Sequence, residues 1–294
     1  MKTVVIDKKD ISLTLQNSAI KIDEQSIPLR LIDFLILNHR AILNTSDILK
    51  ITKEGISILL ISYTNDNFSL ITSANTKNAQ TKLYQYNSLK RNLEFAKYFI
   101  SKKIDLYVKH LYNHNILLDQ TKEQQNIKNA KSLDKILGIE GLFAKKYFQK
   151  YFSLLPKSMH KSKRSKQPPL DPVNAVLSFW YSLYYNIITA KLISYGFEPS
   201  LGYLHTPFRT HNALSSDILE LFRADINEAV INLFKKRVLN KDDFTKNRGV
   251  FLKYSGRKKI WSDFLALVDS LKPKLDAEIG YLKRRIYEEK SCCD

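Results

Sequence analysis

Cysteine is almost absent from this chain. The 294 residues include only Cys292 and Cys293, which are adjacent near the C-terminus. Two neighbouring cysteines suit neither a disulfide that cross-links distant segments nor a zinc cluster. We therefore expect a protein of the reducing cytoplasm.

Long uninterrupted apolar runs are absent as well. The longest apolar stretch, 176–195, is interrupted by Ser178, Ser182, Asn186 and Lys191. Such interruptions favour a buried core helix over a membrane span. The first ten residues carry charges of both signs around a short apolar run, which is typical of a strand and not of a secretory signal peptide. We expect no membrane partner.

Acidic residues are outnumbered by basic ones. Lys and Arg total 47 against 29 Asp and Glu, which gives a formal net charge of +18. This balance favours anionic partners, nucleic acid first and an acidic membrane surface second. Residues 1–85 carry 10 basic and 8 acidic side chains, so the excess lies in the remainder. We expect a polyanion to bind mainly there.

The pattern of apolar residues changes near residue 74. Before it, short runs rich in β-branched residues predict a small antiparallel β domain. One helix is expected there at about 46–53, capped by Ser46 and ended by Gly55. After it, longer periodic segments predict helices. These segments are 89–117, 139–155, 172–195, 217–238 and 261–287.

The expected fold is therefore α+β. A β-rich N-terminal domain is predicted over 1–73, a linker over 74–88, and a larger all-α domain over 89–294. A polar, basic segment at 156–169 has little to bury, and we expect it to be a mobile loop. It ends where Asp171 can cap a helix and Pro172 can occupy its first position.

Four residues have the side chains of a divalent-metal site: Glu140, His205, Asp217 and Glu220. Asp217 and Glu220 are three apart, so on a helix they share a face, and carboxylates suit Mg²⁺ or Mn²⁺. The same pair resembles the capping box at the start of a helix. The pattern alone leaves both interpretations open.

The other two candidates are weaker by themselves. His205 lies in an expected loop, where histidines are commonly solvated, although imidazole suits Mn²⁺ better than Mg²⁺. Glu140 stands between Gly138 and Gly141 at the expected start of a helix. Glycines there let a ligand approach closely, but they equally mark a turn into the helix. Spacing alone does not bring Glu140 to His205.

Four blocks occur in an order that resembles a known family. They are LGIEG at 137–141 followed by KYF at 146–148, PPLDPVNA at 168–175, GYLH at 202–205 and DILELFR at 217–223. The chain resembles the CRISPR-associated endonuclease and integrase of spacer acquisition, the first-numbered Cas protein. The likeness includes the β-rich beginning and YSGR at 254–257, so it spans essentially the whole chain.

The resemblance implies a β-sandwich-like N-terminal domain, a helical catalytic domain and a homodimer that associates with the small second-numbered Cas protein. It implies that Glu140, His205 and Glu220 bind Mg²⁺ or Mn²⁺, and that Asp217 is a nearby acidic residue that contributes to the catalytic site. Asn174 falls in a block near the site. The implied activity is metal-dependent cleavage and joining of double-stranded DNA, by attack of water or a DNA 3′-hydroxyl on a phosphodiester.

Basic residues in two segments are expected to contact DNA phosphates, which position DNA without reading its sequence. They are Lys161, Lys163, Arg164 and Lys166 in the expected loop, and Arg248, Arg257 and Lys258 further on. Two alternatives remain. One is a non-catalytic basic DNA-binding scaffold, and the other is a general metal-dependent repair nuclease.

Overall fold

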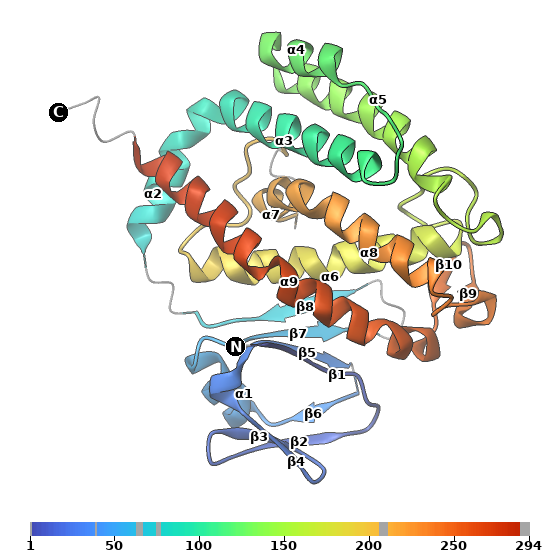
Figure 1. Ribbon diagram of the computed structural model, residues 1–294. Coiled ribbons are helices and arrows are strands. Elements are labelled where there is room, and N and C mark those ends of the chain that lie inside the picture. The colour runs from blue at the N-terminus through green and yellow to red at the C-terminus, as the bar shows by residue number, and fades with distance from the viewer. Residues whose placement is uncertain (1, 39, 63–66, 75–77, 206–210, 289–294) are drawn as a thin grey trace.

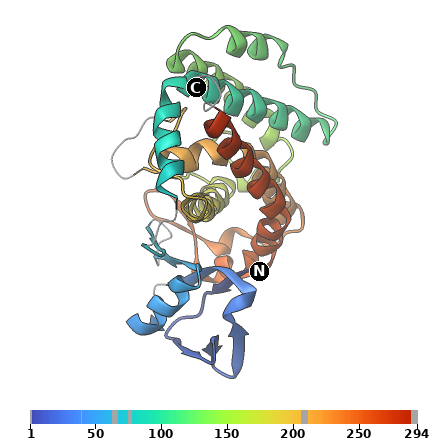
Figure 2. The same cartoon turned by 90° about the vertical axis from the view of Figure 1, so that its left-hand side faces the viewer.

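The computed structural model describes residues 2–38, 40–62, 67–74, 78–205 and 211–288. Cys292 and Cys293 lie outside the described residues. In both Figure 1 and Figure 2 the strands of the first part of the chain lie at one end of the molecule and most helices lie at the other. The predicted α+β class, with a β-rich beginning followed by a helical region, is confirmed.

Two four-stranded sheets form the β-rich region. The first has the order β1 (Lys2–Ile6), β5 (Ile32–Asn38), β7 (Ser57–Ile61) and β8 (Phe68–Ile71). The second has the order β4 (Gln25–Pro28), β3 (Ala19–Ile22), β2 (Ser12–Gln16) and β6 (Ile42–Leu43). A 3₁₀ turn, η1 (Leu29–Leu31), joins β4 to β5.

The prediction of an antiparallel domain is wrong for several pairs. Strands β1 and β5, β5 and β7, and β2 and β6 are parallel. Parallel neighbours need a long crossover connection. Strands β2 to β4 supply it between β1 and β5, and helix α1 (Thr45–Lys53) supplies it between β5 and β7.

Helix α1 lies close to its predicted position, but its predicted cap is wrong. The Asn44 side chain accepts a hydrogen bond from the Asp47 backbone N–H at 2.8 Å and serves as the N-cap. Ser46 lies inside the helix and donates to the Asn44 side chain. Gly55 follows the helix with a φ of +81°, a left-handed conformation that favours glycine.

The first sheet is shared by two cores. Leu35 and Leu37 of β5 pack with residues of the second sheet. Phe34 and Ile36, on the opposite face of β5, pack with the helices. Since both faces are covered, β5 is apolar along nearly its whole length and does not alternate between apolar and polar residues.

The helical region contains eight α-helices within the described residues. They are α2 (Ala79–Ser88), α3 (Asn92–Tyr112), α4 (Thr121–Asn129), α5 (Leu133–Phe152), α6 (Pro172–Ser194), α7 (Ala213–Leu219), α8 (Arg223–Lys235) and α9 (Tyr254–Tyr287). Short 3₁₀ turns η2 (Leu89–Arg91), η3 (Lys157–Met159), η4 (Glu220–Phe222) and η5 (Lys241–Asp243) connect several of them. Strands β9 (Phe244–Lys246) and β10 (Val250–Leu252) form a small antiparallel hairpin.

Helix α6 is the predicted core helix. Asp171 caps it by accepting a hydrogen bond from the Asn174 backbone N–H, and Pro172 occupies the first turn, as predicted. Figure 2 shows it nearly end-on among the other helices. Within the described parts of the chain, no helix is long and apolar enough to cross a membrane.

Several helix boundaries differ from the prediction. Most of the expected linker at 74–88 forms α2, which packs against the rest of the molecule through Thr81, whose hydroxyl lies 2.9 Å from that of Tyr287. Helix α5 begins at Leu133 because Ser132 caps it, so Glu140 lies well inside the helix. The expected helix at 217–238 is divided into α7, η4 and α8.

Candidate functional site

A cavity of about 700 Å³ lies where α3, α5, η4 and two loops meet. Glu140, His205 and Glu220 all line it, although they come from three separate segments. Their ligand atoms do not form a group within 4.8 Å among the residues that the structure describes. The fold therefore brings the three predicted ligands to one cavity, but with another side chain between the two carboxylates.

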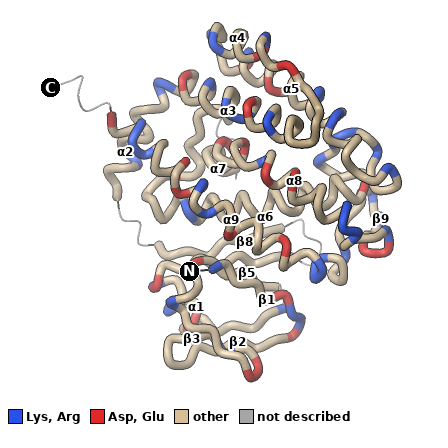
Figure 3. Tube along the Cα trace, viewed as in Figure 1, with Lys and Arg blue, Asp and Glu red and all other residues tan. Residues whose placement is uncertain are grey.

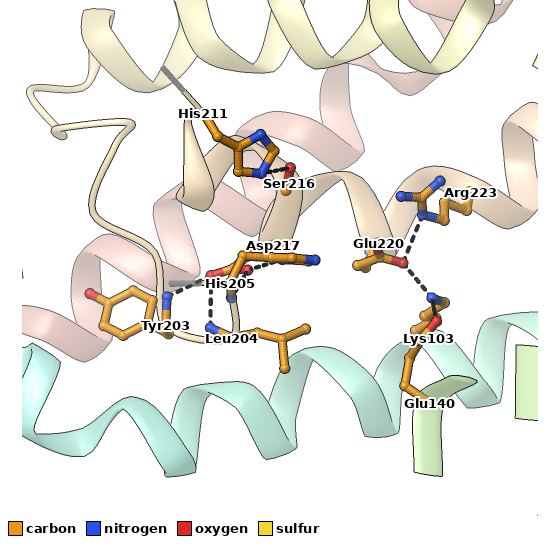
Figure 4. A network of polar contacts seen from close by, with 10 residues as sticks. All are labelled: Lys103, Glu140, Tyr203, Leu204, His205, His211, Ser216, Asp217, Glu220 and Arg223. Atoms are coloured by element: carbon orange, nitrogen blue, oxygen red, sulfur yellow. Dashed lines mark hydrogen bonds and ion pairs between the residues drawn. The ribbon is translucent and has the colours of Figure 1, made fainter. Parts of the chain in front are cut away.

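That side chain is Lys103 of α3, which sequence reasoning missed. Its ammonium forms ion pairs with Glu140 and, at 2.5 Å, with Glu220 (Figure 4). Arg223 donates from Nε to the same oxygen of Glu220 at 2.7 Å. The Lys103 and Glu220 side chains are 4% and 5% exposed, whereas Glu140 is 24% exposed.

The charges in this cluster stabilise one another. Burial alone lowers the pKa of Lys103, but the negative charges of Glu220 and Glu140 outweigh burial and raise it. Burial also acts to raise the pKa of Glu220, but Arg223 and Lys103 outweigh it and hold that pKa well below its usual range. Both residues therefore remain charged at neutral pH.

Asp217 is completely buried, and its carboxylate accepts hydrogen bonds from one loop. Its Oδ2 accepts hydrogen bonds from the backbone N–H groups of Tyr203 at 2.6 Å and Leu204 at 3.1 Å, and its Oδ1 accepts from that of His205 at 3.0 Å. Gly202 is required beside it, because a Cβ there would lie 2.9 Å from Asp217 Oδ2. Asp217 thus fixes the 203–205 backbone.

The capping interpretation of Asp217 and Glu220 is wrong. Asp217 lies inside α7, which begins at Ala213, and its carboxylate bonds to the 203–205 loop and not to the start of a helix. Glu220 begins η4, and its carboxylate pairs with Lys103 and Arg223. The two carboxylates therefore serve different parts of the site.

His205 is oriented by the same aspartate. Its Nδ1 donates to Asp217 Oδ1 at 2.7 Å, which leaves Nε2 as the ring nitrogen suited to binding an ion. Burial lowers the pKa of His205, but the hydrogen bond and charge of Asp217 outweigh burial and raise it. The His205 side chain is 33% exposed, so the cavity gives it access to a ligand.

The side chains around the cavity fit a divalent cation. Two carboxylates and an oriented imidazole form an oxygen-rich donor set of the kind that binds Mn²⁺ or Mg²⁺. The cavity already places a cation, the Lys103 ammonium, against both carboxylates. Asp217 is not available as a ligand while both of its oxygens accept hydrogen bonds from the 203–205 loop.

The predicted basic loop after α5 borders the same cavity. Lys163, Arg164 and Lys166 line it. Asn174, which is fully buried in α6, donates to the Lys163 carbonyl at 2.8 Å and accepts from the Ser165 backbone N–H at 3.1 Å. The loop is present as predicted, but its backbone is held to the first turn of α6.

The other basic residues have different environments. Figure 3 shows Lys and Arg on the loop after α5 and beside β9. Lys161, Arg248 and Lys258 are exposed. Arg257 is only 1% exposed and forms two hydrogen bonds to Asp7 at 2.7 and 2.8 Å. Its expected DNA contact conflicts with this burial, since the guanidinium joins α9 to the end of β1.

Lys103 and Arg223 were recognisable from the sequence as residues that need or have an acidic partner. Lys103 interrupts the apolar face of α3, where Phe99, Ile100 and Tyr107 are buried. A lysine on such a face requires an acidic partner. Arg223 stands three residues after Glu220, the spacing at which opposite charges meet on a helix.

The comparisons with known proteins agree with this architecture. Residues 2–265 match the family model described as CRISPR associated protein Cas1. A relative from Thermodesulfovibrio yellowstonii, named CRISPR-associated endonuclease Cas1 1, is 30% identical, with 99% of this chain and 98% of the relative covered.

Solved structures show the same fold. A CAS1 protein from Thermotoga maritima superposes with a TM-score of 0.89 at 19% identity, covering 100% of this chain and 99% of the other. A casposase bound to integration product superposes with a TM-score of 0.87 at 22% identity, covering 100% and 93%. The family match over most of the sequence, together with the near full-length relative, shows that this chain belongs to the Cas1 family of CRISPR-associated proteins.

Proposed function

We propose that this protein is a metal-dependent DNA endonuclease and integrase that inserts spacer DNA into a CRISPR repeat array. The observation that carries the proposal is the convergence of Glu140, Glu220 and the oriented imidazole of His205 on one cavity of a Cas1-family chain. The cavity is bordered by lysines, which suits a phosphodiester substrate.

Glu140, His205 and Glu220 would hold a Mn²⁺ or Mg²⁺ ion. When bound, such an ion polarises a phosphate and stabilises the charge that develops on its oxygens. Asp217 keeps the proton of His205 on Nδ1, so that Nε2 remains available to a ligand. Arg223 pairs with Glu220 and keeps that carboxylate ionised.

The partners follow from the surface charge and from the relatives. We propose double-stranded DNA as substrate, a homodimer as the basic assembly, and Cas2 as a further protein partner. One chain of a solved complex titled Cas6-RT-Cas1–Cas2 superposes with a TM-score of 0.79 at 22% identity, covering 99% of this chain and 35% of the other.

We also propose that the two sheets form a β-sandwich-like domain over 1–73, attached to a catalytic domain over 89–294.

Joining of a labelled short duplex to a plasmid tests the proposal. We expect strand transfer in Mn²⁺ or Mg²⁺ that is abolished by EDTA. Salt-sensitive DNA binding without any product in either metal would instead favour the non-catalytic scaffold.

The exposed lysines of the loop after α5 should govern the salt dependence of DNA binding. Replacing Lys161 and Lys163 with alanine is expected to reduce the slope of log K against log salt concentration by about 2, since each phosphate contact contributes about 1. Fluorescence anisotropy at several salt concentrations measures this slope. A matched control replaces Lys50 and Lys53 of α1, in the β-rich region, and should leave it unchanged. Equal slopes for both double variants would place DNA elsewhere.

Asn174 should control the order of that loop. In Asn174→Ala, the Lys163 carbonyl and Ser165 N–H lose a buried partner, which costs about 1–3 kcal/mol. We expect trypsin to cleave the loop several times faster than in the unaltered protein. Asn186→Ala on the same helix is the control, because the Asn186 side chain donates to the Ser182 carbonyl of α6 itself. Identical cleavage rates for the two variants would contradict the role of Asn174.

A further inference from the structure

A second group of metal-ligating side chains lies between α3 and α8. His110 is in the last turn of α3, His114 is in the turn that follows, and Glu228 projects from α8. The Nε2 atoms of His110 and His114 lie 3.0 and 2.6 Å from the same oxygen of Glu228. The ligand atoms all lie within 4.8 Å of one another, and within the described parts of the chain this is the only such group of three or more.

The separations are close to those of a tetrahedral ion. With metal–ligand bonds of about 2.0–2.1 Å, the ligand atoms of a zinc ion are separated by roughly 3.3 Å. The two nitrogen–oxygen distances, 3.0 and 2.6 Å, therefore need to increase by about 0.3 and about 0.7 Å. Such a change lies within the reach of side-chain rotation alone.

His110, the more deeply buried of the two histidines, is oriented through its second ring nitrogen. The Nδ1 of His110 lies 3.0 Å from the hydroxyl of Tyr147, and that hydroxyl accepts a hydrogen bond from Asn227 Nδ2 at 2.9 Å. Tyr147 and Asn227 are fully buried. Metal-binding histidines are commonly oriented in this way through their second ring nitrogen.

The cluster is open on one side. The side chain of His110 is 6% exposed and that of His114 is 16% exposed, whereas that of Glu228 is 40% exposed. An ion can therefore enter from solvent and retain a water molecule as a fourth ligand.

We propose that His110, His114 and Glu228 form a transition-metal site, with Zn²⁺ as the preferred class of ion, distinct from the catalytic cavity. Two imidazoles and one carboxylate suit Zn²⁺ better than Mg²⁺. The ion fastens α3 to α8. Lys103 lies two helical turns from His110 on α3. Arg223 begins α8, and Glu220 begins η4, the turn that leads directly into α8. The ion therefore fixes the two helices that carry or adjoin the buried ion pairs of the catalytic cavity.

The full-length double variant Glu140→Gln/His205→Gln separates this site from the catalytic one. We expect it to bind one equivalent of Zn²⁺, in competition with a chromophoric chelator, with a dissociation constant below about 1 µM. Co²⁺ in place of Zn²⁺ should give the visible absorption of a four-coordinate ion. Adding His114→Gln should weaken Zn²⁺ binding at least about 100-fold and remove the absorption.

His160→Gln in the same background is the matched control and should change neither measurement, because the His160 ring nitrogens bond to the Leu155 carbonyl and the Ser162 backbone N–H. Glu228→Gln, at a partly exposed position, provides a second variant if His114→Gln lowers stability. The proposal is overturned if the double variant gives no four-coordinate Co²⁺ absorption. It is also overturned if neither His114→Gln nor Glu228→Gln weakens Zn²⁺ binding.

Discussion

Glu220→Gln is expected to lower the rate of metal-dependent strand transfer by roughly 10²- to 10³-fold or more. The substitution removes a proposed metal ligand and also leaves Lys103 and Arg223 without their shared carboxylate. Removing one partner of a buried ion pair costs about 3–5 kcal/mol of stability. Rates of joining in Mn²⁺ and the free energy of unfolding in urea measure the two effects.

Glu140→Gln separates these two effects. Glu140 has the same proposed role, but its side chain is 24% exposed and Lys103 retains Glu220 as a partner. We expect a comparable loss of strand transfer with a much smaller loss of stability. Asp134→Asn, at an exposed position on the same helix, should change neither quantity. Full activity in Glu140→Gln would exclude Glu140 as a ligand.

Lys103→Met is expected to make the stability of the protein depend on divalent metal. Without the ammonium, Glu140 and Glu220 lose the cation that they share, and we expect unfolding in EDTA to require about 3–5 kcal/mol less free energy. A Mn²⁺ ion bound by both carboxylates replaces that charge. Urea unfolding in Mn²⁺ should therefore recover much of the loss, with a larger metal effect than in the unaltered protein.

The neighbouring lysine is the control for this experiment. Lys102 also pairs with a glutamate, Glu278 at 2.5 Å, but it is 35% exposed and faces α9. Lys102→Met should lower stability to a smaller extent, and Mn²⁺ should stabilise it no more than the unaltered protein. If Mn²⁺ stabilises Lys103→Met and Lys102→Met equally, Glu140 and Glu220 do not share an ion.

Local patterns predicted those parts of the molecule that local interactions determine. The short β-branched runs became strands, and Asp171 and Pro172 began α6 as expected, because a cap depends on a few adjacent residues. The parallel pairing of β1 with β5 was not predicted. Pairing depends on which distant strands share a core, and the periodicity of one strand does not contain that information.

The site was predictable in its residue types but not in its pairings. Glu140, His205 and Glu220 reach one cavity, yet nothing near Glu140 in the sequence indicates that it shares Lys103 with Glu220. Arg257 shows the converse error. Its position beside Lys258 and Lys259 predicts a basic surface. On helix α9, however, Arg257 faces inward and pairs with Asp7, whereas Lys258 and Lys259 are exposed.

The first sheet packs against the helices on one face and against the second sheet on the other, which limits how segments of this protein can be exchanged with those of its relatives. Strand β5 presents Phe34 and Ile36 to the helices and Leu35 and Leu37 to the second sheet. Exchanging the first 73 residues between two family members would therefore join two halves of one interior that were never selected together. A chimera of that kind has to carry over the helix residues that meet β5, so the β-rich region is not an interchangeable module.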